Sequence, residues 1–255
     1  MQRENGGEMV KGQSVIILAG GFGKRIKSAW DGPKGLIPYL GKTILWHVLA
    51  EISESKETRE ITLVSNAAHL ALYQQYCLKE GFDQVRMIND GAEHVEEARG
   101  ALNDLLLGLD EARAGDVMVL PCDTVTKGVF ALADFANFGH LHQDGVGVVA
   151  RKMKKEEIRG RFGNVLIDQE QRITQFVEKP SEPISVYASA AIYYYPANTR
   201  EWVREYLKEG NNAESTGMII PWLLAKKRNV YGYETPGGII DVGSPAEFPK
   251  TEGKK

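Results

Sequence analysis

Cysteine is scarce in this chain of 255 residues, which contains only Cys77 and Cys122. Two cysteines cannot form a disulfide framework, and their spacing matches no metal-binding motif. Cys77 falls on the apolar side of a predicted helix, and Cys122 stands at the end of a predicted strand. We therefore expect two buried free thiols.

Clustered histidine is also lacking. Of the five histidines, only His140 and His142 lie close together, and no third ligand lies near them in the sequence. A structural zinc site needs four ligands. We therefore expect this pair in a surface loop rather than in a zinc site.

Long apolar runs and a strong net charge are both missing. No apolar run approaches the ~20 residues that a membrane-spanning helix needs, so we expect no membrane partner. Residues 1–13 are polar and lack the apolar stretch of a signal peptide, so we expect a flexible N-terminal segment and a cytoplasmic protein. The formal net charge is −3, which offers no global attraction for nucleic acid. Any anion site must therefore be local.

Two common phosphate-binding motifs are absent. The chain contains no Gly-x-x-x-x-Gly-Lys-Ser/Thr run, which excludes a P-loop. The dinucleotide fingerprint Gly-x-Gly-x-x-Gly would need a glycine where Ile26 stands. A phosphate site in this chain must be built in another way.

A different glycine-rich turn follows the apolar run at 15–19. Residues 15–25 are Val-Ile-Ile-Leu-Ala-Gly-Gly-Phe-Gly-Lys-Arg, and Pro33-Lys34 follows shortly after. Glycines let the backbone lie against a ligand, and successive N–H groups then form a concavity for an anion. A tight strand-to-helix connection would explain the glycines alone. The cations Arg25 and Lys34 favour a polyphosphate site.

Strand-like and helix-like segments alternate from residue 14 to about 150, which is typical of a doubly wound sheet. Later strands are joined by turns. We predict an α/β fold with a Rossmann-like mixed, mostly parallel sheet, helices on both faces and a small β extension. One domain is expected at 14–248, followed by a polar tail at 249–255. Strands are expected at 15–19, 61–65, 84–88, 117–120, 146–150, 164–167, 173–177, 188–195 and 230–233, and helices at 43–52, before Gly81, and at 98–112, 200–208 and 218–226.

Two aspartates stand at the ends of predicted strands. Asp123 follows the strand at 117–120, and Asp241 follows the apolar pair 239–240. Open α/β sheets bind ligands at the carboxyl ends of their strands. Two carboxylates on one crevice, joined by phosphate oxygens, would make a Mg²⁺ site. Each aspartate alone is equally compatible with a helix N-cap or a turn, so the inference depends on the pair.

A second group of polar residues closes the strand at 173–177. Glu178-Lys179-Pro180 offers a carboxylate for hydroxyl groups and a cation for a phosphate, although a solvated turn is the alternative explanation. Gly163, which precedes the same hairpin, permits close approach of the backbone to a ring.

In their order along the chain, these segments resemble the NDP-sugar pyrophosphorylases, or sugar-1-phosphate nucleotidylyltransferases, which have a GT-A-like fold. The resemblance covers about residues 14–248. It rests on the following segments: 15–25, Pro33-Lys34, 40–45, Asp123, Phe162-Gly163, Glu178-Lys179-Pro180, 188–194 and 240–243.

The resemblance implies Mg²⁺-dependent transfer of a nucleotidyl group from an NTP to a sugar 1-phosphate, which gives an NDP-sugar and pyrophosphate. It also implies that the β extension lies over the sugar side. It assigns catalytic roles to Arg25, Lys34 and Lys179. The implied NTP-binding residues are Ala19, Gly20, Gly21, Gly23, Lys24, Arg25, Lys34 and Gly100, the sugar-phosphate-binding residues are Gly163, Glu178 and Lys179, and the metal ligands are Asp123 and Asp241.

The chain departs from the family pattern mainly on the sugar side. Lys24 stands where the family usually has a small hydroxyl residue. Thr124 and Ser189 stand where asparagines are frequent, and Ile239-Ile240 stands before Asp241 where an aromatic residue is frequent. The nucleobase and the acceptor are therefore open, with Asn89 and Asp90 as candidates for contact with the base.

Two other functions stay open. A cytidylyltransferase would act on a phosphorylated alcohol such as phosphocholine, and would need an aromatic, acidic pocket for the quaternary ammonium. A non-catalytic regulatory paralogue would bind a nucleotide-sugar without turnover. The sequence does not fix the oligomeric state, and a homo-oligomer is compatible with it.

Overall fold

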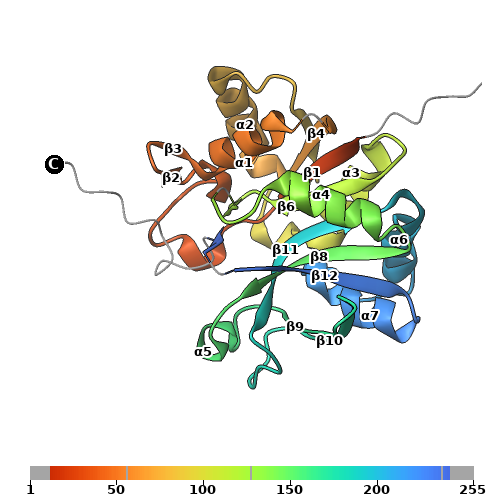
Figure 1. Cartoon of the computed structure of the whole chain (residues 1–255). Helices are drawn as coiled ribbons and strands as arrows, with labels where there is room; N and C mark the ends of the chain where they lie inside the picture. Colours follow the sequence, from red (N-terminus) through yellow and green to blue (C-terminus); the bar gives the residue numbers. More distant parts are fainter. Residues whose placement is uncertain (1–11, 56, 127, 237, 242–255) are drawn as a thin grey trace, which may run out of the picture.

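The structure is a computed structural model that describes residues 12–55, 57–126, 128–236 and 238–241. Its central feature is a sheet of nine strands with helices on both faces (Figure 1). The first part of this sheet is parallel. Its strands, in spatial order, are β6 (Val117–Pro121), β1 (Gln13–Ala19), β4 (Thr58–Ser65) and β5 (Arg86–Asn89).

The second part of the sheet is built around β11 (Tyr187–Tyr195). This strand is antiparallel to β6, to β8 (Gly145–Lys152) and to β9 (Asn164–Ile167). β12 (Asn229–Thr235) runs parallel to β8, and β10 (Ile173–Val177) forms a hairpin with β9. The predicted α/β fold with a mixed, mostly parallel sheet and a small β extension is confirmed.

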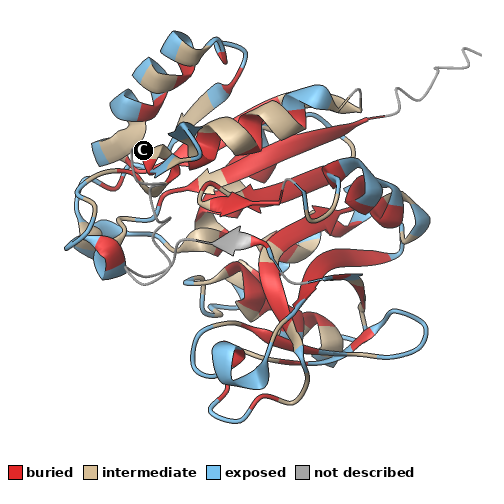
Figure 2. Cartoon of the chain, turned by 60° about the vertical axis from the view of Figure 1, so that its left-hand side comes forward, coloured by how far each residue is buried: buried red, intermediate tan, exposed pale blue. Residues whose placement is uncertain are grey.

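The helices divide between the two faces because side chains alternate along each strand. Val15 and Ile17 of β1 belong to one core cluster, and Ile16 belongs to the other. Figure 2 shows that the strands are largely buried between the helices. The first cluster is covered by α1 (Ile44–Glu54), α2 (Ala67–Glu80) and α4 (Leu132–Leu141), and the second by α3 (Ala101–Glu111), α6 (Glu201–Lys208) and α7 (Ile219–Ala225).

Local side chains fix the ends of the first two helices. The Thr43 hydroxyl accepts a hydrogen bond from the Trp46 amide at the start of α1, and Asn66 does the same for His69 at the start of α2. Gly81 ends α2 in the left-handed conformation, with φ 80°, as its expected role as a C-cap requires.

The expectation of a surface loop around His140 and His142 is wrong. His140 lies in α4, and His142 caps its C-terminal end. The segment contains Gly139, a poor helix former, which conceals the helix in the sequence. A Cβ at Gly139 would overlap the ring of Tyr194, so tertiary packing of the helix on β11 requires this glycine.

Four very short strands, one short α-helix and five 3₁₀ helices complete the described chain. The 3₁₀ helices are Lys24–Ile26, Lys34–Leu36, Val95–Glu97, Ala197–Thr199 and Thr216–Met218. β2 (Pro38–Tyr39) pairs with β3 (Lys42–Thr43), β7 (Thr124–Val125) pairs with β13 (Ile240–Asp241), and α5 (Lys155–Ile158) precedes β9. None of the helices within the described ranges has the length and apolar character needed to cross a bilayer. Most of the predicted N-terminal segment and the whole polar tail lie outside the described residues.

Candidate functional site

The order of the strands marks one place on the sheet. From β1 the chain adds β4 and β5 on one side, and then returns to place β6 on the other side of β1. Ligands of open α/β sheets bind at such a switch point, outside the carboxyl ends of the strands. The glycine turn follows β1 there, and Asp123 follows β6.

The glycine turn presents its backbone on one side and is held on the other. Gly21 is exposed, and a Cβ at this residue would meet no atom within 4 Å. Gly23 has φ 63°, in the left-handed region that favours glycine. The carbonyl of Gly20 accepts a hydrogen bond of 3.0 Å from Nδ2 of Asn66, the N-cap residue of α2. The turn is therefore anchored and its outer face is open.

The cations at the exit of the turn lie on a short 3₁₀ helix, Lys24–Ile26. Lys24 and Arg25 are exposed, whereas Ile26 is fully buried and Ala19 is buried at the end of β1. The core position of Ile26 explains why a dinucleotide fingerprint does not occur here. The two exposed cations stand beside the open face of the turn.

Lys34 and Asp123 meet at the switch point. Nζ of Lys34 lies 2.9 Å from Oδ2 of Asp123, with side-chain exposures of 17% and 14%. The two residues are far apart in the sequence, and the fold brings the lysine expected at the phosphates next to the aspartate expected at the metal ion. A half-buried cation and carboxylate next to an exposed glycine turn suit a polyphosphate and a metal ion.

Asp241 reaches the same place through its backbone. In the pairing of β13 with β7, Asp241 stands opposite Thr124, the residue after Asp123. The side chain of Asp241 lies outside the described part, as do the residues after it. Among the described residues, no group of three His, Cys, Asp or Glu side chains gathers around a common point. The donors available are carboxylate oxygens, which fit Mg²⁺ together with phosphate oxygens and water.

The predicted sugar-side residues also come together. A Cβ at Gly163 would lie 2.5 Å from the ring of Phe176 and 3.2 Å from Oε2 of Glu178. Nζ of Lys179 lies 3.6 Å from Oε1 of Glu178. Lys179 has φ 44°, a conformation that non-glycine residues adopt rarely and that stores strain. Gly163, Glu178 and Lys179 thus form one cluster at the end of the β9–β10 hairpin.

The unusual segment Ser189-Ala190-Ala191 forms a bulge in β11. The register shifts between Ser189 and Tyr193, and Ala191 has φ 56°. The Ser189 amide donates to the carbonyl of Gly163 at 2.8 Å, which ties the bulge to the sugar-side cluster. On the same strand, the Tyr193 hydroxyl accepts a hydrogen bond from Thr216 at 3.2 Å.

Arg151 connects the two halves of the candidate site, and no sequence motif points to this residue. The residue is buried at the end of β8, and Nη1 donates to the carbonyl of Ile239 at 3.1 Å. Its guanidinium also lies 4.4 Å from the ring centroid of Phe162, next to Gly163. One buried cation therefore joins the segment before Asp241 to the sugar side.

Gly100 has a packing role in addition to its predicted contact with the base. It precedes α3 with φ 88°, and a Cβ there would lie 2.5 Å from the carbonyl oxygen of Ala213. The Leu102 amide donates to that same oxygen at 3.0 Å. The backbone of Ala213 thus covers this side of the glycine, and the contact with a base stays a prediction.

The two cysteines are buried free thiols, as predicted. Burial raises the pKa of Cys77 to about 11, and burial followed by the charge of Asp123 raises the pKa of Cys122 to about 12. Neither thiol is activated as a nucleophile.

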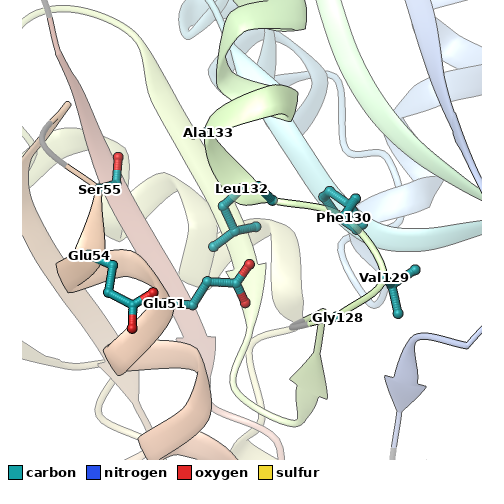
Figure 3. Close-up of a pocket in the computed structure, with 9 residues that line it drawn as sticks. Glu51, Glu54, Ser55, Gly128, Val129, Phe130, Leu132 and Ala133 are labelled. Atoms are coloured by element: carbon teal, nitrogen blue, oxygen red, sulfur yellow. The ribbon is translucent and has the colours of Figure 1, made fainter.

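A cavity of about 430 Å³ lies away from these residues, between the end of α1 and the segment that leads into α4 (Figure 3). Glu51 and Glu54 line one side, and Phe130 and Leu132 line the other. The lining contains none of the predicted site residues. Glu51 accepts a hydrogen bond from the Thr126 hydroxyl at 2.8 Å, which ties α1 to the segment after β7.

The topology and the position of the glycine turn define a Rossmann-like α/β protein with a candidate site at the switch point. The family model described as Nucleotidyl transferase matches residues 14–253, and the chain belongs to this family. The chain is 25% identical over 244 residues to the mannose-1-phosphate guanylyltransferase catalytic subunit beta of Drosophila pseudoobscura pseudoobscura. The matched region makes up 93% of this chain but only 61% of that protein.

Two further similarities differ in how much of the chain they cover. Over 109 residues the chain is 39% identical to the 2-C-methyl-D-erythritol 4-phosphate cytidylyltransferase of Thermobifida fusca, across 39% of this chain and 43% of that one. The solved structure of the nucleoside-diphosphate-sugar pyrophosphorylase of Vibrio cholerae superimposes on this chain with a TM-score of 0.70 at 19% identity. The superposition includes 92% of this chain and 98% of the solved one. The last similarity establishes the fold alone.

Proposed function

We propose that this chain uses Mg²⁺ to transfer a nucleotidyl group from an NTP to a sugar 1-phosphate, with release of pyrophosphate. The observation that carries the proposal is the Lys34–Asp123 pair beside the open glycine turn. The lysine can bind the negatively charged triphosphate, and the carboxylate can bind the metal ion that accompanies it. Membership of the nucleotidyl transferase family and similarity to a sugar-1-phosphate guanylyltransferase support the reaction and the acceptor class.

In the proposed reaction, an oxygen of the acceptor phosphate forms a bond to the α-phosphorus of the NTP. The bond from that phosphorus to the α–β bridging oxygen breaks, and pyrophosphate leaves with the electron pair. No protein nucleophile is needed. Catalysis then consists of positioning the two phosphates and neutralising their charge.

Charge repulsion between the substrates makes the cations necessary. Two unit charges 4 Å apart near a protein surface repel by about 4 kcal/mol, and both substrates carry several charges. In this proposal the backbone N–H groups of the glycine turn, with Arg25 and Lys34, hold the triphosphate. Lys179 holds the acceptor phosphate, while Gly163 and Glu178 hold the sugar.

Asp123 and Asp241 are the proposed Mg²⁺ ligands. When bound, the ion polarises phosphoryl oxygens as a Lewis acid. The Lys34 ammonium lies 2.9 Å from Asp123, and this ion pair holds the carboxylate at the switch point.

A cytidylyltransferase that acts on an alcohol phosphate is the second candidate. It is favoured by the 39% identity, over part of the chain, to a cytidylyltransferase whose name gives an alcohol phosphate as its substrate. The chemistry at the α-phosphorus would be the same, and only the nucleobase and the acceptor would differ.

Pyrophosphate release tests both candidates. The purified chain is incubated with each of the four ribonucleoside triphosphates or with dTTP, in the presence of Mg²⁺ or EDTA. Hexose 1-phosphates and alcohol phosphates are offered as acceptors. We expect Mg²⁺-dependent release with at least one hexose 1-phosphate. Release with CTP and an alcohol phosphate alone would establish the second candidate instead.

Two variants make the test specific. Asp123→Asn should reduce pyrophosphate release by at least about tenfold, because a charged hydrogen-bonding or ligand group contributes about 1.5–3 kcal/mol. Asp83→Asn, at an exposed aspartate between α2 and β5, is the matched control and should retain full activity. Nucleotide-sugar binding without turnover under any condition would indicate the non-catalytic paralogue. An unchanged rate in Asp123→Asn would refute the metal assignment.

A further inference from the structure

Two carboxylates meet behind the first glycine of the turn. A Cβ at Gly20 would overlap Oδ2 of Asp104 and would lie 2.9 Å from Oδ2 of Asp90. Asp90 follows β5, and Asp104 lies in the first turn of α3, so two separate elements direct their acids at one backbone position. No residue with a side chain fits at Gly20 without displacing this pair.

Both carboxylates are buried. Asp90 is 4% exposed and Asp104 is 6% exposed. Oδ1 of Asp90 accepts a hydrogen bond from the Ala92 amide at 2.7 Å, whereas Oδ1 of Asp104 is buried without a hydrogen-bond partner. A buried ionised carboxylate would require such partners. The environment of Asp104 is therefore that of a protonated acid.

The charged groups around the pair are few. Arg99 donates to the backbone carbonyl of Asp90 at 3.2 Å, and its charge favours ionisation of Asp104. His69 of α2 contacts Asn66 on the far side of Gly20, and burial lowers the pKa of His69. Burial and then the like charge of Asp90 outweigh Arg99 and raise the pKa of Asp104 to about 7. A buried carboxyl group next to a second carboxylate favours its protonated form, and here that group is Asp104.

We propose that Asp104, in its protonated form and hydrogen-bonded to Asp90, is a positioning residue that holds the Gly20 backbone in the conformation that receives the NTP. This inference rests on the proposed function, because it assigns the glycine turn to the nucleotide. Gly20 is fixed from two sides, by the Asn66 amide on its carbonyl and by the carboxyl pair against its Cα.

Loss of the Asp104 proton has two consequences for nucleotide binding. The two carboxylates repel each other and separate, which removes the support from Gly20. A second negative charge also appears behind the turn, close to where the triphosphate would lie. Both effects weaken NTP binding as the pH rises, so the chain should bind NTP best below neutral pH.

The test measures the dissociation constant of an NTP–Mg²⁺ complex by calorimetry, without acceptor, between pH 6 and pH 8.5. If only the protonated pair supports binding, the dissociation constant of the wild-type chain rises by about tenfold per pH unit above the pKa. Asp104→Asn preserves the shape and a donor but cannot ionise. Its dissociation constant should therefore rise less with pH, by a difference of at least about fivefold at pH 8.

Asp110→Asn is the matched control, since Asp110 lies on the same helix but pairs with Arg204 at the surface. It should follow the wild-type profile. The phosphates of the NTP titrate identically with all three proteins, so the difference between profiles isolates Asp104. If Asp104→Asn does not fold, carbon-13 NMR of the wild-type aspartate carboxyls keeps the test decisive, because a midpoint below pH 5 for Asp104 would overturn the proposal.

The outcomes separate this inference from the proposed function. Equal pH profiles for wild type and Asp104→Asn overturn the positioning role and leave the transferase intact. A flattened profile in Asp104→Asn with no pyrophosphate release from any acceptor supports the positioning role and contradicts the transferase. Absence of NTP binding at every pH overturns both.

Discussion

The carboxyl pair behind Gly20 also makes the folding stability depend on pH. The pKa of Asp104 rises from 3.8 to about 7 on folding. Between these values the folded chain binds more protons than the unfolded chain, so stability falls as the pH increases. Each unit of difference corresponds to about 1.4 kcal/mol, so the complete loss from acid to alkaline pH is about 4 kcal/mol.

Asp104→Asn should remove this dependence. From pH 5 to pH 8 the wild-type chain should lose about 2.5 kcal/mol of unfolding free energy relative to the variant. Urea unfolding followed by circular dichroism at pH 5, 6, 7 and 8 measures the difference. Other titrating groups are common to both proteins and cancel. Asp110→Asn should remain parallel to the wild type.

A parallel decline of wild type and Asp104→Asn across this range would refute the reasoning. It would mean that Asp104 ionises in the folded chain as readily as in the unfolded one, by turning outward or by taking up water. A greater loss in the variant than in the wild type would contradict the sign of the effect.

Three further predictions concern the turn, the two lysines and the thiols. Gly20→Ala should destabilise the fold by about 1–3 kcal/mol in urea unfolding and weaken NTP binding, since its Cβ overlaps the carboxyl pair; unchanged binding would contradict the geometry of the turn. Lys34→Ala should raise the dissociation constant of the NTP by about 10–100-fold. Lys179→Ala should instead raise the KM of the acceptor. Reversed effects would exchange the roles of the two lysines. Cys77 and Cys122 should react with a thiol reagent only after unfolding, because both are buried; rapid labelling of the native chain would show that the thiols are accessible.

The order of the elements could be predicted from local patterns. The strand at 117–120 is a continuous apolar run because it is covered on both faces, and α2 ends at a glycine because its C-cap needs a positive φ. The helix α4 could not be predicted, because Gly139 has a low helix propensity. A glycine is required there by its close contact with the ring of Tyr194, which the sequence does not reveal.

The same limit applies to the site. Lys34 and Asp123 were each predicted as site residues because each belongs to a short motif with its own chemistry, but the ion pair between them was not predicted. Asp90 and Asp104 carry no such motif, and only the packing of α3 against the turn brings them together. In the sequence, Arg151 cannot be told from an exposed charged residue at the end of a strand. Its burial depends on β11 and β12, which pair with β8 on either side of it.

The antiparallel pairing of β13 with β7 has a consequence for the order of folding. Asp241 is far from Thr124 along the chain, yet the two stand opposite each other. Closing a contact across so long a stretch of chain costs more conformational entropy than closing a local one. This pairing therefore becomes favourable only after the intervening strands have formed their own hydrogen bonds and brought the two segments near each other.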